Sequence, residues 1–104
     1  MMNDILIAGI SGSVWAIDKR TGTEVWRTIL EKALFSRSSP SDVSVLIDGD
    51  LIYAGCNGRV YGLSATTGEI LWVNKMKGAG YNEISLAVQG VNTQFISRER
   101  VVNN

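Results

Sequence analysis

Apolar residues in this chain come in short runs interrupted by glycine-containing turns, a spacing typical of short β-strands. Glycine favours tight turns because it adopts positive φ without steric cost. The pattern predicts antiparallel strands and no helix longer than one or two turns. In the first third of the chain the strands and turns alternate in this order: Ile5 to Ala8, Ser11-Gly12, Val14 to Ile17, Thr21-Gly22 and Glu24 to Leu30.

A second unit follows with the same organisation. Its turns are Asn57-Gly58 and Thr67-Gly68, and a further strand, Val43 to Ile47, precedes it before the turn Asp48-Gly49. Asn-Gly is a strong hairpin signal because both central residues of a type I′ turn require positive φ. We therefore expect four strands per unit, the number found in a propeller blade.

The two units are copies of one repeat. Residues 4–26 match residues 50–72 at a constant offset of 46, without a gap. Gly9 corresponds to Gly55, Gly22 to Gly68 and Trp26 to Trp72. A repeat period of about 40 to 50 residues lies in the range of propeller blades.

A third unit begins downstream. Ile84 to Val88, followed by Gln89-Gly90, matches Val43 to Ile47 followed by Asp48-Gly49, and Thr93 to Ser97 is the next expected strand. The sequence thus predicts an all-β fold: a β-propeller fragment of two four-stranded antiparallel blades plus part of a third. Within residues 1–104 we place repeat 1 at about residues 3–30, repeat 2 at about 43–76 and a partial repeat 3 at about 84–102.

Composition and charge limit the classes of partner that we expect for this chain. Hydrophobic residues make up 45% of the chain and charged residues 19%, which argues against disorder. Lys and Arg balance Asp and Glu at ten each, and no compact basic patch stands out, because Lys19-Arg20 and Lys75-Met76-Lys77 are isolated. We therefore expect neither nucleic acid nor a membrane as a partner.

The chain has one cysteine, Cys56, and no histidine. These counts exclude an intramolecular disulfide, Ser-His-Asp catalysis and histidine metal sites within this chain. Cys56 is expected to be an inert small residue beside a hairpin. No signal peptide or membrane span is recognised, so a cytoplasmic location is the default expectation.

One motif carries a family resemblance. The pattern Ala16-x-Asp18-x-x-Thr21-Gly22-x-x-x-Trp26 resembles the tryptophan-docking motif of pyrroloquinoline quinone (PQQ) propellers. In the second copy Gly62 replaces the alanine and Ser64 replaces the aspartate. The threonine, glycine and tryptophan recur there as Thr67, Gly68 and Trp72.

The resemblance implies that the tryptophans are structural. In that family the indole packs on the neighbouring blade near its glycine turn, and the motif's threonine and aspartate satisfy backbone groups of the turn. The expected blade-docking residues are Ala16, Asp18, Thr21, Gly22, Trp26, Gly62, Thr67, Gly68 and Trp72.

The same family includes PQQ-dependent dehydrogenases, whose features can be sought here. The adjacent cysteine pair of the alcohol dehydrogenases is missing, and each available aspartate lies at a predicted turn or strand boundary. Because two blades form no closed channel to hold a cofactor, we expect no catalytic, cofactor or metal site and no catalysis by this chain alone. PQQ and calcium are expected as cofactors only if the chain is part of a quinoprotein dehydrogenase.

Two blades also leave strand edges and faces uncovered, so a stable monomer is not expected. The expected partners are other blades of the same protein or further copies of the chain assembled head-to-tail, and a protein partner for the completed propeller. A non-catalytic interaction or scaffold module is the favoured function. The alternatives are a fragment of a quinoprotein dehydrogenase and a propeller appended to another enzyme.

Overall fold

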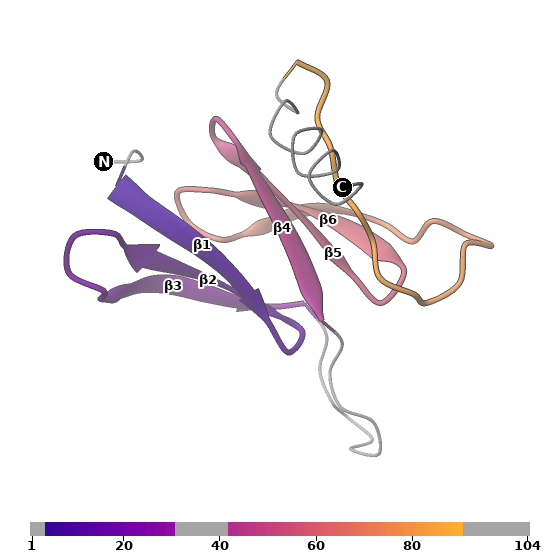
Figure 1. The fold of residues 1–104 in the computed structure, drawn as a ribbon, viewed down its shortest axis with the longest axis horizontal. Helices are drawn as coiled ribbons and strands as arrows, with labels where there is room; N and C mark the ends of the chain where they lie inside the picture. The colour runs from indigo at the N-terminus through magenta and orange to yellow at the C-terminus, as the bar shows by residue number, and fades with distance from the viewer. Residues whose placement is uncertain (1–3, 31–41, 91–104) are drawn as a thin grey trace, which may run out of the picture.

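The structure, a computed structural model, describes residues 4–30 and 42–90. Within these residues the chain forms two antiparallel sheets, one with the order β1-β2-β3 and one with the order β4-β5-β6-β7. Figure 1 shows the two sheets side by side, with β4 beside β1. The strands are β1 (Ile5–Ile10), β2 (Ser13–Asp18), β3 (Glu24–Ile29), β4 (Val43–Asp48), β5 (Leu51–Cys56), β6 (Arg59–Ser64) and β7 (Ile70–Asn74).

The hairpin turns have the conformation that their sequences predict. Ser11 and Gly12 have φ values of 44° and 76°, and Asn57 and Gly58 have φ values of 53° and 78°. Both central residues of each turn therefore adopt the positive φ of a type I′ hairpin. This geometry fixes the register of β1 on β2 and of β5 on β6.

Both sheets contain a shift in strand pairing, of the kind a β-bulge produces, at positions 46 residues apart. The pairing of β2 with β3 shifts between Ala16 and Ile17, and the pairing of β6 with β7 shifts at the equivalent step between Gly62 and Leu63. As a result, Trp26 lies opposite Ala16 and Trp72 lies opposite Gly62. The bulge thus places each tryptophan beside the first residue of its motif.

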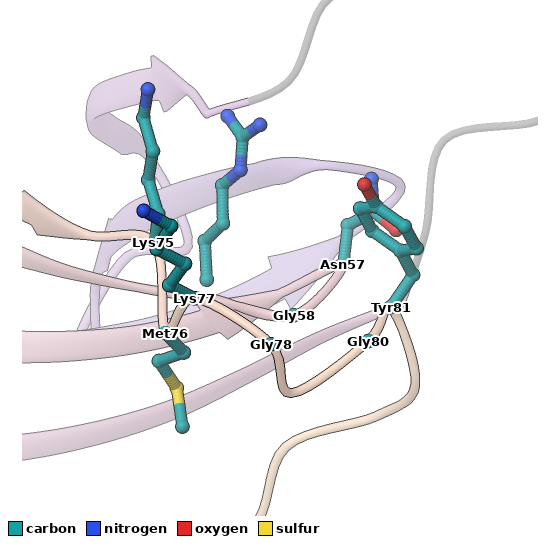
Figure 2. Close-up of a pocket in the computed structure, with 9 residues that line it drawn as sticks. Asn57, Gly58, Lys75, Met76, Lys77, Gly78, Gly80 and Tyr81 are labelled. Carbon is teal, nitrogen blue, oxygen red and sulfur yellow. The ribbon is translucent and has the colours of Figure 1, made fainter.

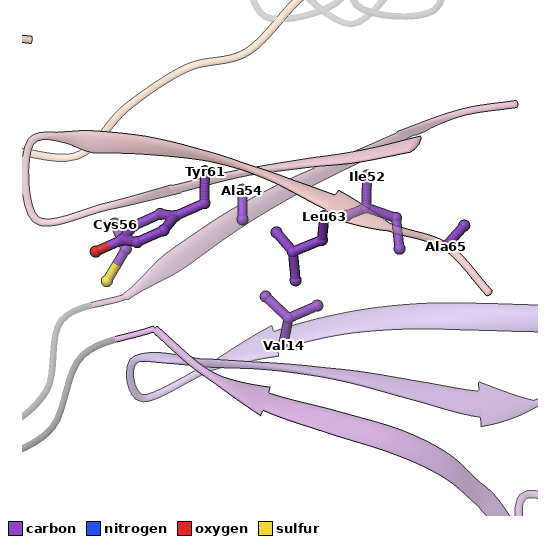
Figure 3. Close-up of a cluster of buried hydrophobic side chains, with 7 residues drawn as sticks. All are labelled: Val14, Ile52, Ala54, Cys56, Tyr61, Leu63 and Ala65. Atoms are coloured by element: carbon purple, nitrogen blue, oxygen red, sulfur yellow. The ribbon is translucent and has the colours of Figure 1, made fainter. Parts of the chain in front are cut away.

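The hydrophobic core lies between the two sheets. Figure 3 shows Val14 of β2 pointing toward Ile52 and Leu63 of the second sheet, and all three side chains are fully buried. The phenolic hydroxyl of Tyr61 donates a hydrogen bond to the carbonyl oxygen of Leu30 across the interface, at 3.4 Å. Cys56 is buried in the same cluster, as expected of a small apolar residue.

The sequence and the structure agree on an all-β fold of propeller sheets. They differ in two places. The first sheet has three strands in the described part of the chain, against four in the second. Residues 84–88, which match β4 in sequence, carry no strand assignment, because none of the described residues pairs with them. The strand expected at Thr93 to Ser97, like residues 91–102 of the third repeat, lies outside the described residues.

No helix in the described part of the chain has the length and apolar character that crossing a bilayer requires.

Candidate functional site

The turn between β2 and β3 holds three of the motif residues. The carboxylate Oδ1 of Asp18 accepts a hydrogen bond from the backbone N–H of Arg20 at 2.8 Å, and Thr21 Oγ1 accepts one from the N–H of Thr23 at 3.2 Å. Gly22 follows with a φ of 81°. Polar side chains thus satisfy the backbone donors of a turn that glycine closes.

The second copy of this turn shows how serine replaces the aspartate. Ser64 Oγ accepts hydrogen bonds from the N–H groups of Thr66 at 3.2 Å and Thr67 at 3.3 Å, and Thr67 Oγ1 accepts one from Glu69 N–H at 3.2 Å. Gly68 has a φ of 82°, close to that of Gly22. The departure from the family pattern at Ser64 therefore preserves the conformation of the turn.

The side chain of Trp26 bridges the two sheets. Its indole Nε1 donates a hydrogen bond to the carbonyl oxygen of Ala65 at 3.1 Å, and its ring lies so close to Gly68 that a Cβ there would overlap it. Thr28 lies two residues after Trp26 on β3, and its hydroxyl Oγ1 donates a hydrogen bond to the carbonyl oxygen of Gly68 at 2.6 Å. Ala16, opposite Trp26, is fully buried. One indole and one hydroxyl of the first sheet thus contact the glycine turn of the second.

Trp72, the repeat equivalent of Trp26, has a different environment. Its side chain is 43% exposed, and its Nε1 has no acceptor among the described residues. The indole lies over Gly62, where a Cβ would overlap it, and its centroid is 6.2 Å from that of Tyr53. Gly62, which replaces the alanine of the motif, therefore lets Trp72 rest on its own sheet. A docking role for Trp72 stays a prediction.

A second feature is a pocket at the end of the second sheet, about 380 Å³ in volume. The loop after β7 folds back over the β5–β6 turn, so closely that a Cβ on Gly58 would overlap the carbonyl of Gly80. Figure 2 shows Lys75 and Lys77 extending to one side of this loop while Met76 points to the other. The pocket is lined by Asn57, Gly58, Arg59, Lys75, Met76, Lys77, Gly78, Gly80 and Tyr81.

The pocket is cationic. Arg59, Lys75 and Lys77 are all exposed, and none of them forms an ion pair with a described residue. Tyr81 beside them is 74% exposed. The sequence did not reveal this cluster, because Arg59 begins β6 and the lysines follow β7, so only the folded loop brings them to one pocket. The arrangement suits a ligand that carries an anionic group next to an apolar group.

The two aspartates near the first turn have partners within the chain. Asp18 caps its turn, and both Asp4 and Asp18 lie near Arg20, at 3.9 and 3.7 Å. In residues 4–30 and 42–90, no group of three or more His, Cys, Asp or Glu side chains could hold a metal ion.

Taken together, repeated antiparallel sheets joined by an indole on a glycine turn define this chain as part of a PQQ-type β-propeller. Residues 3–103 match the PQQ-repeat family described as outer membrane protein assembly factor BamB, and the chain belongs to that family. Among solved structures it is similar to BamB from Moraxella catarrhalis, with 30% sequence identity and a TM-score of 0.53. The match covers 67% of this chain and 20% of the BamB chain, so the chain spans about a fifth of that relative. No curated protein matches the chain.

Proposed function

We propose that this chain is a non-catalytic propeller module that binds an acidic segment of a protein partner through the pocket beside Arg59, Lys75 and Lys77. The observation that carries the proposal is the convergence of three exposed cations, unpaired within the described residues, on a pocket that also presents Tyr81.

The chemistry of the pocket supports a peptide ligand. Lysine and arginine side chains bind carboxylates by charge-assisted hydrogen bonds, and an exposed tyrosine offers contact area at low cost in conformational entropy. An acidic segment with apolar residues between its carboxylates would match both. The family description also names an assembly factor, which supports a scaffold role.

The test is binding of a fluorescein-labelled peptide of alternating glutamate and leucine, followed by fluorescence anisotropy. We expect the double variant Lys75→Glu/Lys77→Glu to bind about tenfold more weakly, since each exposed charge pair contributes up to about 1 kcal/mol and a tenfold change in affinity corresponds to about 1.4 kcal/mol. Lys19→Glu, on the turn after β2, is the matched control and should leave binding unchanged.

A peptide with lysine in place of glutamate controls for nonspecific adsorption. If it binds as well as the acidic peptide, or if Lys19→Glu weakens binding as much as the pocket variant, the proposal is wrong. A titration with PQQ and calcium tests the alternative that the chain is part of a quinoprotein dehydrogenase. That alternative predicts a change in absorbance, whereas a non-catalytic binding module predicts none.

A further inference from the structure

Two pockets adjoin the loop that follows β7. The first is the cationic pocket described above. The second has a volume of about 250 Å³, and its lining includes Ala79 and Glu83. Gly58 and Met76 line both pockets, so the two are neighbours. Figure 2 shows Met76 pointing away from the lysines of the cationic pocket, and we call the pocket that it shares with Glu83 the second pocket.

The two pockets carry opposite charge. The cationic pocket has Arg59, Lys75 and Lys77, whereas Glu83 is the charged residue of the second pocket among the described residues. The side chain of Glu83 is exposed and forms no ion pair with a described residue. A ligand that occupies both pockets therefore meets three cations at one end and a carboxylate at the other.

The pockets are close enough for one short peptide to reach both. Tyr81 lines the cationic pocket, and Glu83, two residues further along the chain, lines the second pocket. Because an extended chain spans at most about 3.6 Å per residue, the Cα atoms of these two residues lie no more than roughly 7 Å apart. An extended ligand covers a similar distance with about two residues, or with up to about four where long side chains turn back.

The loop presents open backbone between the pockets. Gly78 and Gly80 have φ values of 85° and 93°, and a Cβ on either would meet no atom within 4 Å. Hydrogen bonds within the loop fix its course: the N–H of Ala79 donates to the carbonyl oxygen of Met76 at 2.9 Å, and the N–H of Met76 donates to Asn74 Oδ1 at 2.8 Å. The passage from one pocket to the other is therefore free of glycine side chains and held in shape.

We propose that the acidic segment bound at the cationic pocket also carries a basic residue, which lies in the second pocket and pairs with Glu83. The inference rests on the function proposed above, because it extends the same ligand across the loop. The carboxylates of the segment lie over Lys75 and Lys77, and a Lys or Arg follows or precedes them by about two to four residues.

This arrangement gives the site a means of selecting among acidic partners. Complementary charges across an interface favour one register and one partner, and like charges placed together oppose others. A uniformly acidic segment that reaches the second pocket places a carboxylate beside Glu83. A segment with both charges makes a favourable contact in each pocket.

Two fluorescein-labelled peptides test the proposal by fluorescence anisotropy. Both contain a core of alternating glutamate and leucine, flanked on each side by two glycines. One peptide has lysine at each end, which serves either chain direction, and the other has glutamine at each end. We expect the lysine-ended peptide to bind about three- to fivefold more tightly, the gain that one exposed ion pair provides.

Glu83→Gln should abolish the difference between the two peptides and have little effect on the glutamine-ended one. Glu69→Gln is the matched control, because it removes the same charge from an exposed position on the turn before β7, outside both pockets. This control should preserve the difference. Sodium chloride at about 0.5 M should reduce the difference in the wild-type protein, since exposed charges are screened by salt.

The two possible failures give different results. If the lysine-ended peptide binds no more tightly than the glutamine-ended one, or if Glu83→Gln and Glu69→Gln have the same effect, the pairing with Glu83 is wrong and binding at the cationic pocket stands. If Lys75→Glu/Lys77→Glu leaves binding of the glutamine-ended peptide unchanged, the function proposed above is wrong, and this inference with it. Circular dichroism of each variant checks that the fold is kept.

Discussion

The indole nitrogen of Trp26 donates a 3.1 Å hydrogen bond to the carbonyl oxygen of Ala65, across the interface between two sheets. The bond joins a strand of one repeat to a turn of the next, 39 residues along the chain.

Trp26→Phe should keep most of the ring contact with Gly68 and remove the hydrogen bond. The carbonyl of Ala65 then loses its partner in a partly buried setting, so we expect a loss of about 1 kcal/mol in the free energy of unfolding. Urea denaturation followed by circular dichroism measures it. Trp26→Ala, which also removes the ring, should cost more, about 2–4 kcal/mol. Equal losses for the two variants would show that the ring contact contributes nothing.

Gly68→Ala should destabilise the chain more than Gly22→Ala. Both glycines have positive φ, so both substitutions carry a backbone cost of about 1 kcal/mol. At Gly68 the added methyl also meets the Trp26 indole, whereas at Gly22 it meets no atom within 4 Å. Thermal unfolding of dilute protein compares them, and overpacking predicts an additional loss of about 1–3 kcal/mol for Gly68→Ala. A larger loss for Gly22→Ala would contradict the assignment of the docking contact.

Ile52→Ala and Leu6→Ala delete the same kind of group at equivalent positions of the two repeats. Ile52 is fully buried and Leu6 is 54% exposed. We expect a loss of about 2–5 kcal/mol for Ile52→Ala, because a cavity forms in the core, and less than about 1 kcal/mol for Leu6→Ala in dilute protein. Chemical denaturation at low protein concentration is the measurement. Similar losses would mean that Leu6 is covered under these conditions.

The carboxylate of Glu24 should titrate below its ordinary range. Hydrogen bonds from Arg27, at 3.0 Å to each carboxylate oxygen, lower the pKa of Glu24 from the ordinary value of 4.5. Because the folded pKa is lowered, the associated stability is present above pH 4.5 and is lost as the pH falls through the folded value. An NMR titration of the carboxyl carbon measures it.

The control for this titration is Arg27→Met, which should return the pKa of Glu24 to about its ordinary value. High salt should reduce the shift as well, because the pair is exposed to solvent. A Glu24 pKa that does not change in Arg27→Met would assign the shift to another cause.

The strands could be predicted from sequence because their determinants are local. Turns such as Asn57-Gly58 and Thr67-Gly68 fix where strands begin and end, and the repeat of 46 residues confirms each position twice. The turn hydrogen bonds of Asp18 and Thr21 depend on neighbours two residues away, so they too could be inferred from the motif.

Features that depend on distant contacts could not be predicted in the same way. The sequence treats Trp26 and Trp72 as equivalent, but only Trp26 has a neighbouring turn in the described structure. The apolar alternation at residues 84–88 indicates a strand, yet a strand requires a hydrogen-bonded partner that the described residues do not supply. Arg59 joins the lysines only because the loop after β7 folds back on the β5–β6 turn.

The equal position of the bulge in both sheets, after Ala16 and after Gly62, has an evolutionary consequence. Each of the two units contains its own bulge, its own glycine turn and its own tryptophan, at equivalent positions 46 residues apart. A gene encoding such a protein can lengthen by duplicating whole units, because every new junction reuses a contact already selected. Duplication of only part of a unit would instead separate the indole from the turn that it contacts.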